Sequence, residues 1–228
     1  MELIIFSDVH GNIYALEKAI KLMDKYKINN YLFLGDMAGY YYHQNECVKL
    51  LHELPHLISI KGNHDNYFVE AMNNKERIKI LDKKYGYSYS LLKERIDKST
   101  KDYFFSLQDY EKNQVYEAYH GSPNNYLTEY IYPDNNNLSF PTLKSKFLFL
   151  GHTHYNMDKK YYDTRIINPG SIGQPRDYNK PSFCIVDLKN DLVEMVRFDY
   201  DKSRLNNDIN KYDKNNEYLH NILKRENL

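Results

Sequence analysis

The chain has little cysteine, no tryptophan, no net charge and no long apolar run. Its two cysteines, Cys47 and Cys184, are too few for a disulfide framework, so we expect both to be small buried residues. Basic and acidic residues number 31 each, and this balance does not indicate a nucleic-acid or membrane-surface partner. No apolar run approaches the roughly 18 residues of a membrane span, and the N-terminal segment lacks the basic residues of a secretory signal. We therefore expect a cytoplasmic protein.

The first third of the chain alternates strand-like and helix-like patterns. Apolar runs at Leu3–Phe6, Tyr31–Leu34 and Leu57–Ile60 predict strands, and the segments between them carry apolar residues at helical spacing. This βαβαβ order implies parallel strands with right-handed crossovers. Ligands bind beyond the carboxyl ends of the strands in such sheets, so residues that follow these runs are candidates for a functional site.

The remainder of the chain predicts one further helical segment, a set of strands and a helical tail. No stretch rich in proline, serine or glycine marks a linker, so we predict a single domain over residues 1–228. Residues 66–110 are polar and helix-like, and two interpretations are open: an insertion packed on the sheet edge, or a cap that shapes substrate access. The tail from Asp201 predicts a surface helix. Strands are predicted at Val115–Tyr119, Phe147–Leu150, Thr164–Ile167, Phe183–Val186 and Leu192–Phe198, largely antiparallel, with the loop Ser122–Pro141 crossing near the site.

Histidine, aspartate and asparagine recur in five short segments, each of which follows or interrupts an apolar run. Imidazole, carboxylate and carboxamide groups are ligands for borderline divalent cations, and no cysteine lies near them. The i, i+2 spacing of two of the pairs places both side chains on the same side of an extended segment. The segments are Asp8-Val9-His10, Gly35-Asp36, Gly62-Asn63-His64-Asp65, His120-Gly121 and Gly151-His152-Thr153-His154.

In this order the five segments resemble the motifs of the calcineurin-like metallophosphoesterase superfamily, in its small prokaryotic phosphodiesterase-like branch. The resemblance extends from Phe6 to at least Asp177, because the segment 168–176 resembles the one that follows the last motif in that branch. It implies an α/β fold: a four-layer α/β/β/α sandwich of two mixed sheets flanked by helices. It also implies a metal-dependent phosphoric ester hydrolase with two divalent cations, Mn²⁺ first, with Fe, Ni, Co or Zn as alternatives.

The resemblance assigns a role to each motif residue. Asp36 would bridge the cations, because two ions about 3.5–4 Å apart need one ligand that touches both. Hydroxide held between the cations would attack phosphorus, and His64 would protonate the leaving group as general acid. Asp65 would either orient the His64 ring or cap the following helix. The resemblance assigns Asp8, His10 and His154 to one cation, and Asn63, His120 and His152 to the other.

Three further residues are candidates for substrate binding: Asn12, Tyr40 and Arg176. The segment 40–42, all tyrosine, would offer an aromatic face to a nucleobase or aryl leaving group, or else form a packed loop. Asn12 would hydrogen-bond a ligand or the substrate, or else end the turn into the helix. In the serine/threonine phosphatases of the superfamily, the second motif resembles Gly-Asp-x-Val-Asp-Arg-Gly. This chain has Gly39 and Tyr40 in place of the second Asp and the Arg. Without that Arg to grip a phosphomonoester dianion, a diester is favoured. Arg176 would contact phosphate, or pair with Asp177 or a carbonyl.

We therefore predict a phosphodiesterase that acts on a small diester or nucleotide. The alternatives are a phosphomonoesterase, including a protein phosphatase or dinucleoside-polyphosphate hydrolase, and a non-catalytic metal-binding scaffold. Retention of His64 and of a complete ligand set argues against the scaffold.

Overall fold

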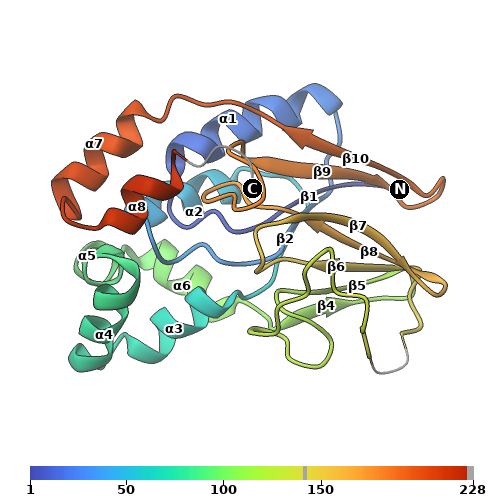
Figure 1. The fold of residues 1–228 in the computed structure, drawn as a ribbon, viewed down its shortest axis with the longest axis horizontal. Helices are drawn as coiled ribbons and strands as arrows, with labels where there is room; N and C mark the ends of the chain where they lie inside the picture. Colours follow the sequence, from blue (N-terminus) through green and yellow to red (C-terminus); the bar gives the residue numbers. More distant parts are fainter. Residues whose placement is uncertain (141–142, 225–228) are drawn as a thin grey trace.

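The protein, described here by a computed structural model over residues 1–140 and 143–224, consists of two stacked sheets with helices packed around them (Figure 1). The sheets have five strands each, in the orders β10-β9-β1-β2-β3 and β4-β5-β6-β8-β7. Both sheets mix parallel and antiparallel pairs, so the predicted fold class is confirmed. No helix among the described residues is long and apolar enough to cross a membrane.

The first sheet contains the predicted βαβαβ unit. Its parallel strands are joined by helices that pack on the outer face. Of its remaining two strands, β9 pairs antiparallel with β1, and β10 pairs antiparallel with β9. The parallel strands end at the same edge, where Asp8, Asp36 and Asn63 follow. The elements are β1 (Glu2–Phe6), α1 (Ile13–Met23), the short 3₁₀ helix η1 (Asp24–Tyr26), β2 (Tyr31–Phe33), α2 (Gln44–His52), β3 (Leu57–Ser59), β9 (Ser182–Asp187) and β10 (Leu192–Arg197).

The second sheet departs from the prediction in the direction of its central strands. We expected largely antiparallel pairing in the second half of the chain; β9–β10 is antiparallel as expected, but β5–β6 and β6–β8 are parallel. The long loop after β5 and the strand β7 both return the chain to its starting edge, which makes the parallel pairing possible. His120 and His152 therefore follow strand ends at the same edge as the motifs of the first sheet. The strands are β4 (Tyr110–Lys112), β5 (Tyr116–Tyr119), β6 (Phe147–Leu150), β7 (Asn156–Tyr161) and β8 (Thr164–Pro169).

The two faces of β1 show how the layers are held together. Leu3 and Ile5 pack between the sheets, whereas Ile4 and Phe6 pack against the helices on the outer face. Burial of each such side chain stabilises the fold by about 1.5–3 kcal/mol. The outer face of the second sheet is covered by the loop 122–140, whose Ile131 packs against this face. Cys47 and Cys184 are both buried and free, as predicted.

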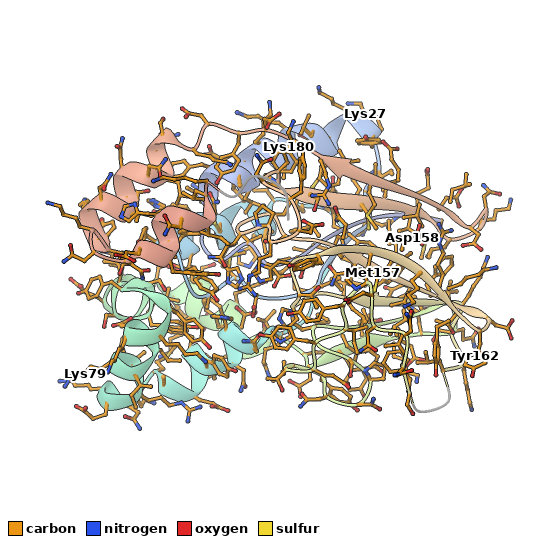
Figure 2. The ribbon with its side chains drawn as sticks, viewed as in Figure 1. Lys27, Lys79, Met157, Asp158, Tyr162 and Lys180 are labelled. Atoms are coloured by element: carbon orange, nitrogen blue, oxygen red, sulfur yellow. The ribbon has the colours of Figure 1, made fainter. Side chains whose placement is uncertain are left out.

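The insertion and the tail form two neighbouring helical groups at one end of the sheets (Figure 1). The insertion comprises α3 (Asn63–Ala71), α4 (Lys75–Tyr85), α5 (Ser88–Arg95) and α6 (Lys98–Ser106). It begins at Asn63, so the third motif itself starts a helix. The tail forms two helices, α7 (Ser203–Tyr212) and α8 (Glu217–Ile222), which pack against the Tyr40–Tyr42 segment. Figure 2 shows Lys79 at the outer end of the insertion and Tyr162 at the opposite end, on the turn between β7 and β8.

Candidate metal centre

The turns at the strand ends adopt a backbone conformation that side chains rarely take. Asp8, His10, Asp36, His152 and His154 have positive φ angles of 55°, 50°, 64°, 66° and 62°. Such conformations cost on the order of 1–3 kcal/mol each and persist where the surrounding structure holds them, typically at functional sites. The strained turns aim the side chains of separate strands at one another.

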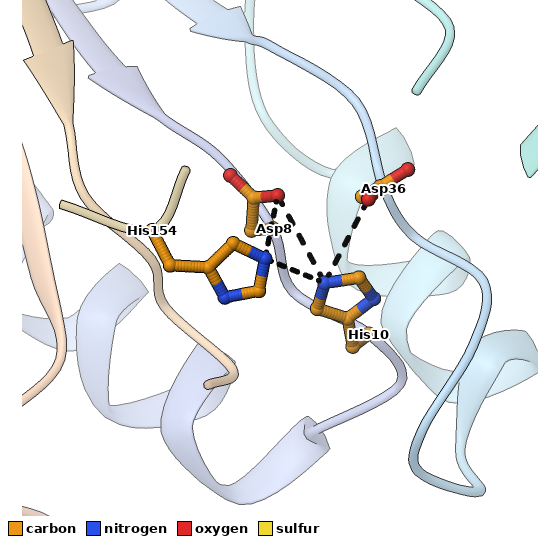
Figure 3. Close-up of side chains that lie close together, drawn as sticks. All are labelled: Asp8, His10, Asp36 and His154. Atoms are coloured by element: carbon orange, nitrogen blue, oxygen red, sulfur yellow. Dashed lines mark hydrogen bonds and ion pairs between the residues drawn. The ribbon is translucent and has the colours of Figure 1, made fainter. Parts of the chain in front are cut away.

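The first cluster consists of Asp8, His10, Asp36 and His154, whose ligand atoms all lie within 4.8 Å of one another (Figure 3). Nε2 of His154 lies 3.2 Å from Oδ1 of Asp8 and 3.3 Å from Nε2 of His10. Nε2 of His10 lies 3.8 Å from Oδ2 of Asp36. One pocket of nitrogen and carboxylate donors results.

The second cluster consists of Asp36, His120 and His152, with Asn63 beside it. Nε2 of His120 lies 3.3 Å from Oδ2 of Asp36 and 3.0 Å from Oδ1 of Asn63. The other oxygen of Asp36, Oδ1, accepts the backbone N–H of His64 at 2.8 Å. Oδ2 of Asp36 is therefore the oxygen that faces both clusters.

Hydrogen bonds fix the orientation of three of these imidazoles. Nδ1 of His10, His120 and His154 donates to the carbonyl oxygens of Ala38, Leu34 and Gln174, at 2.7, 2.7 and 2.5 Å. In the neutral ring, a proton on Nδ1 leaves the lone pair on Nε2, which is the atom directed into the clusters. Metal-binding histidines are typically held in this way.

Several buried polar atoms at the clusters have no hydrogen-bond partner among the described residues. They are both carboxylate oxygens of Asp8, Oδ2 of Asp36 and Nε2 of His152. Unpaired buried carboxylates and imidazoles are costly unless a cation or donor compensates them. The donor set of carboxylate, imidazole and carboxamide fits two divalent cations.

The pKa values in this region follow from burial and from the two aspartates. Burial lowers the pKa of His10 to about 4 and that of His152 to about 3, which keeps both rings neutral. Burial disfavours the charged form of His120 too, but Asp36 and Asp8 raise its pKa to about 9. The pKa of Asp36 lies well below its usual range despite burial, because His120, His64 and His10 surround it.

Of the two roles considered for Asp65, the structure shows the helix cap and no hydrogen bond to the His64 ring. Asp65 does not contact the His64 ring: its oxygens accept the backbone N–H groups of Asp36, Met37, Ala38 and Gly62 at 2.8–2.9 Å. Burial and Asp36 raise its pKa to about 7. It thereby fixes the turn that carries Asp36, and through Gly62 it also serves the start of α3.

The His64 ring is instead engaged by a tyrosine of the insertion. Its Nδ1 lies 2.6 Å from the hydroxyl of Tyr89 in α5. Sequence reasoning missed Tyr89 because it is one of 24 tyrosines and no spacing links it to a motif.

Comparison with known proteins assigns the fold and its clusters to a family. Residues 1–191 match the family described as the calcineurin-like phosphoesterase superfamily domain. The chain belongs to this superfamily. It is therefore a metal-dependent phosphoester hydrolase, and its substrates are phosphate esters.

Three relatives resemble this phosphoesterase over nearly their full length. An uncharacterized protein from Methanocaldococcus jannaschii is 31% identical over 223 residues, covering 86% of this chain and 87% of that protein. The metallophosphoesterase from Sphaerobacter thermophilus superposes with a TM-score of 0.80 at 27% identity, covering 98% of this chain and 99% of that one. A hypothetical protein from Pyrococcus horikoshii OT3 superposes with a TM-score of 0.83 at 22% identity, covering 97% of each chain.

The clusters of the phosphoesterase lie at the base of a cavity of about 260 Å³. Besides the motif residues Asn63 and His64, the insertion contributes Tyr67, Lys84 and Tyr85 to the lining, and the loop predicted to cross near the site contributes Thr128 and Tyr130. These contacts favour the second interpretation of the insertion, that it shapes substrate access. Pro141, at the end of the predicted loop, lies outside the described residues. The remaining lining residues are Asp36, Tyr40, His152, His154 and Arg176.

The three predicted substrate-binding residues occupy different surroundings. Tyr40 and Arg176 line the cavity, and Nη2 of Arg176 donates to the Tyr40 hydroxyl at 3.1 Å. Asp177 pairs with Arg197 and not with Arg176. Asn12 caps α1, and its side chain also donates to the Gly173 carbonyl and the Tyr200 hydroxyl. Tyr40 and Arg176 therefore lie in the wall of the cavity, whereas Asn12 supports the turn at the start of α1.

Proposed function

We propose that this phosphoesterase is a phosphodiesterase that hydrolyses a small diester or nucleotide with two divalent cations, Mn²⁺ being our first choice. The observation that carries the proposal is the shared position of Asp36, whose Oδ2 faces both donor clusters under the cavity. Asp8, His10 and His154 would hold one cation, and Asn63, His120 and His152 the other. When bound, the cations supply an acidified water and neutralise charge on the phosphate oxygens.

His64 would protonate the departing oxygen. It lines the cavity, and Tyr89 engages its Nδ1, which leaves Nε2 to serve the leaving group. Burial lowers its pKa, and the negative charge of Asp36 opposes that effect. A bound phosphate anion would also raise the pKa of His64, since a nearby negative charge favours the imidazolium form.

The size and the lining of the cavity favour a small phosphate ester that carries an aromatic group as substrate. The cavity volume of about 260 Å³ is below the roughly 300–1,000 Å³ typical of pockets for drug-sized ligands. Tyr40, Tyr67, Tyr85 and Tyr130 offer aromatic faces, on which a nucleobase or aryl group stacks favourably. Tyr40 also replaces the phosphate-gripping Arg of the protein phosphatases, which favours a diester.

A phosphomonoesterase is the second candidate, because one observation favours it. Arg176 lies in the cavity, where its Nη2 donates to Tyr40 and Gln174, and its Nε has no hydrogen-bond partner among the described residues. A guanidinium with spare donors can grip a phosphate dianion. Arg176 would then bind phosphate in place of the protein-phosphatase Arg, at whose position this chain has Tyr40.

The two candidates are separated by comparing bis-p-nitrophenyl phosphate with p-nitrophenyl phosphate in the presence of Mn²⁺. For a phosphodiesterase we expect a higher kcat/KM with the diester, and Tyr40→Arg should narrow the ratio by improving monoester binding. Arg176→Met is the matched test of the second candidate. A wild-type preference for the monoester that disappears in Arg176→Met would establish the phosphomonoesterase instead.

A further inference from the structure

The partner of the His64 ring comes from the insertion, outside the five motifs. The hydroxyl of Tyr89 lies 2.6 Å from Nδ1 of His64, and it is the one side-chain hydrogen-bond partner of that ring among the described residues. Tyr89 is fully buried and His64 is 5% exposed. Water therefore has little access to the bond, so the tyrosine hydroxyl determines which way the imidazole faces.

The turn after Asp36 leaves no room for another partner. A Cβ atom on Gly39 would lie 2.3 Å from Nδ1 of His64, which is closer than real atoms approach. The neighbouring carboxylate of Asp65 is occupied by four backbone N–H groups of the same turn and of Gly62. The turn therefore supplies no side-chain hydrogen bond to Nδ1, and the one that the structure shows comes from the insertion.

We propose that Tyr89 is a positioning residue for the reaction, and that its hydroxyl holds the His64 ring with Nε2 facing the leaving group. The inference rests on the proposed role of His64 as the acid. A hydroxyl can accept the Nδ1–H proton of the ring both before and after Nε2 releases its own proton. The hydrogen bond then persists through the step, in which the Nε2–H bond breaks and a new O–H bond forms on the departing oxygen.

Leaving-group dependence distinguishes a positioning role from a structural one. Methyl phenyl phosphate and methyl p-nitrophenyl phosphate carry the same charge and differ in the leaving phenol. The p-nitrophenolate ion departs without a proton, whereas phenolate benefits from one. A variant that misplaces the acid should lose turnover on the first substrate and keep it on the second.

We expect Tyr89→Phe to lower kcat on methyl phenyl phosphate about tenfold and on methyl p-nitrophenyl phosphate less than about twofold, as part of the roughly 10²–10⁴-fold that general acid catalysis contributes. Tyr103→Phe is the matched control, because Tyr103 is a buried tyrosine of the insertion whose hydroxyl has no hydrogen-bond partner within the described residues. It should leave the ratio of the two rates unchanged.

His64→Ala separates failure of the inference from failure of the proposed function. A selective loss in His64→Ala with no selective loss in Tyr89→Phe overturns the role of Tyr89 and leaves the acid in place. An equal loss on both substrates in His64→Ala overturns the acid role and the inference with it.

A spectroscopic measurement applies even where Tyr89→Phe fails to fold. In the wild-type protein labelled with ¹⁵N-histidine and prepared without added metal, the His64 ring is identified by the signal missing from His64→Ala. We expect a slowly exchanging proton shared between Nδ1 and the tyrosine oxygen. Rapid exchange of that proton with solvent would overturn the inference.

Discussion

At the scale of single residues, both donor clusters depend on Asp36. One of its oxygens is held by the His64 N–H, and the other faces His10 and His120 from opposite clusters. Removal of its carboxylate should therefore affect both cations, whereas removal of Asp8 should affect one.

We expect two ions per chain in the wild type after saturation with Mn²⁺, close to none in Asp36→Ala, and close to one in Asp8→Ala. Elemental analysis after removal of free metal gives these ratios directly. Retention of both ions by Asp36→Ala would exclude Asp36 as the shared ligand, and a wild-type stoichiometry of one ion in the active enzyme would contradict the binuclear proposal.

Asp65 supports this arrangement through the backbone alone. Each of its oxygens accepts two N–H groups, so the NH₂ of an asparagine would meet two donors and leave them unsatisfied. We expect Asp65→Asn to lower the free energy of unfolding by roughly 2–4 kcal/mol, since each buried donor left unpaired costs about 1–3 kcal/mol. Asp97→Asn is the control: Asp97 caps α6, and asparagine caps a helix equally well, so denaturant unfolding should show a change below about 0.5 kcal/mol.

The seven candidate ligands could be predicted because each lies in a short contiguous motif at a strand end. Tyr89 could not, because its contact with His64 spans 25 residues and depends on how α3 and α5 pack. The cap by Asp65 was one of the two roles that the sequence allowed, but its hydrogen bonds to the turn at Asp36 could not be foreseen, because they depend on how that turn packs against α3.

At the scale of elements, sequence patterns predicted the strands with strongly apolar runs. They missed β7, in which polar and charged residues dominate and Met157 is the one buried position, and the short charged strand β4. Both are edge strands of the second sheet, where one neighbour is absent and polar residues are tolerated. The parallel pairing beside β6 was also beyond local patterns, because it depends on the path of the loop after β5.

The insertion and the tail meet at Asp213, just after α7. Its Oδ2 accepts the hydroxyl of Tyr42 at 2.8 Å and the backbone N–H of Tyr87 at 2.9 Å, and so joins the tail to the turn after Asp36 and to the insertion. We expect Asp213→Ala to speed amide hydrogen exchange in residues 83–92 roughly tenfold, as the loss of a charged hydrogen bond of about 1.5 kcal/mol implies. Asp201→Ala is the control, because Asp201 bonds to Ser203 within the tail. Equal exchange in both variants would exclude this coupling.

At the scale of the whole molecule, the cation site joins the two sheets. Asp8, Asp36 and Asn63 follow strands of the first sheet, whereas His120 and His152 follow strands of the second. The unfolded chain cannot bring these residues together, so a cation that binds them binds the folded state selectively. Metal binding should therefore stabilise the contact between the sheets as well as the site.

We expect Mn²⁺ to raise the thermal unfolding midpoint of the wild type in a concentration-dependent way. At a free concentration of about 100 times Kd, each site adds about 2.7 kcal/mol, and a chain of this size gains roughly 2–4 °C per kcal/mol, so two sites predict a rise on the order of 10–20 °C. Asp36→Ala should lose nearly all of the rise and Asp8→Ala about half. Asp158→Asn, which breaks an exposed ion pair with Arg165 on β8, should retain the full rise. A rise in Asp36→Ala equal to that of the wild type would mean that Mn²⁺ stabilises the protein from somewhere other than the edge at which both sheets end.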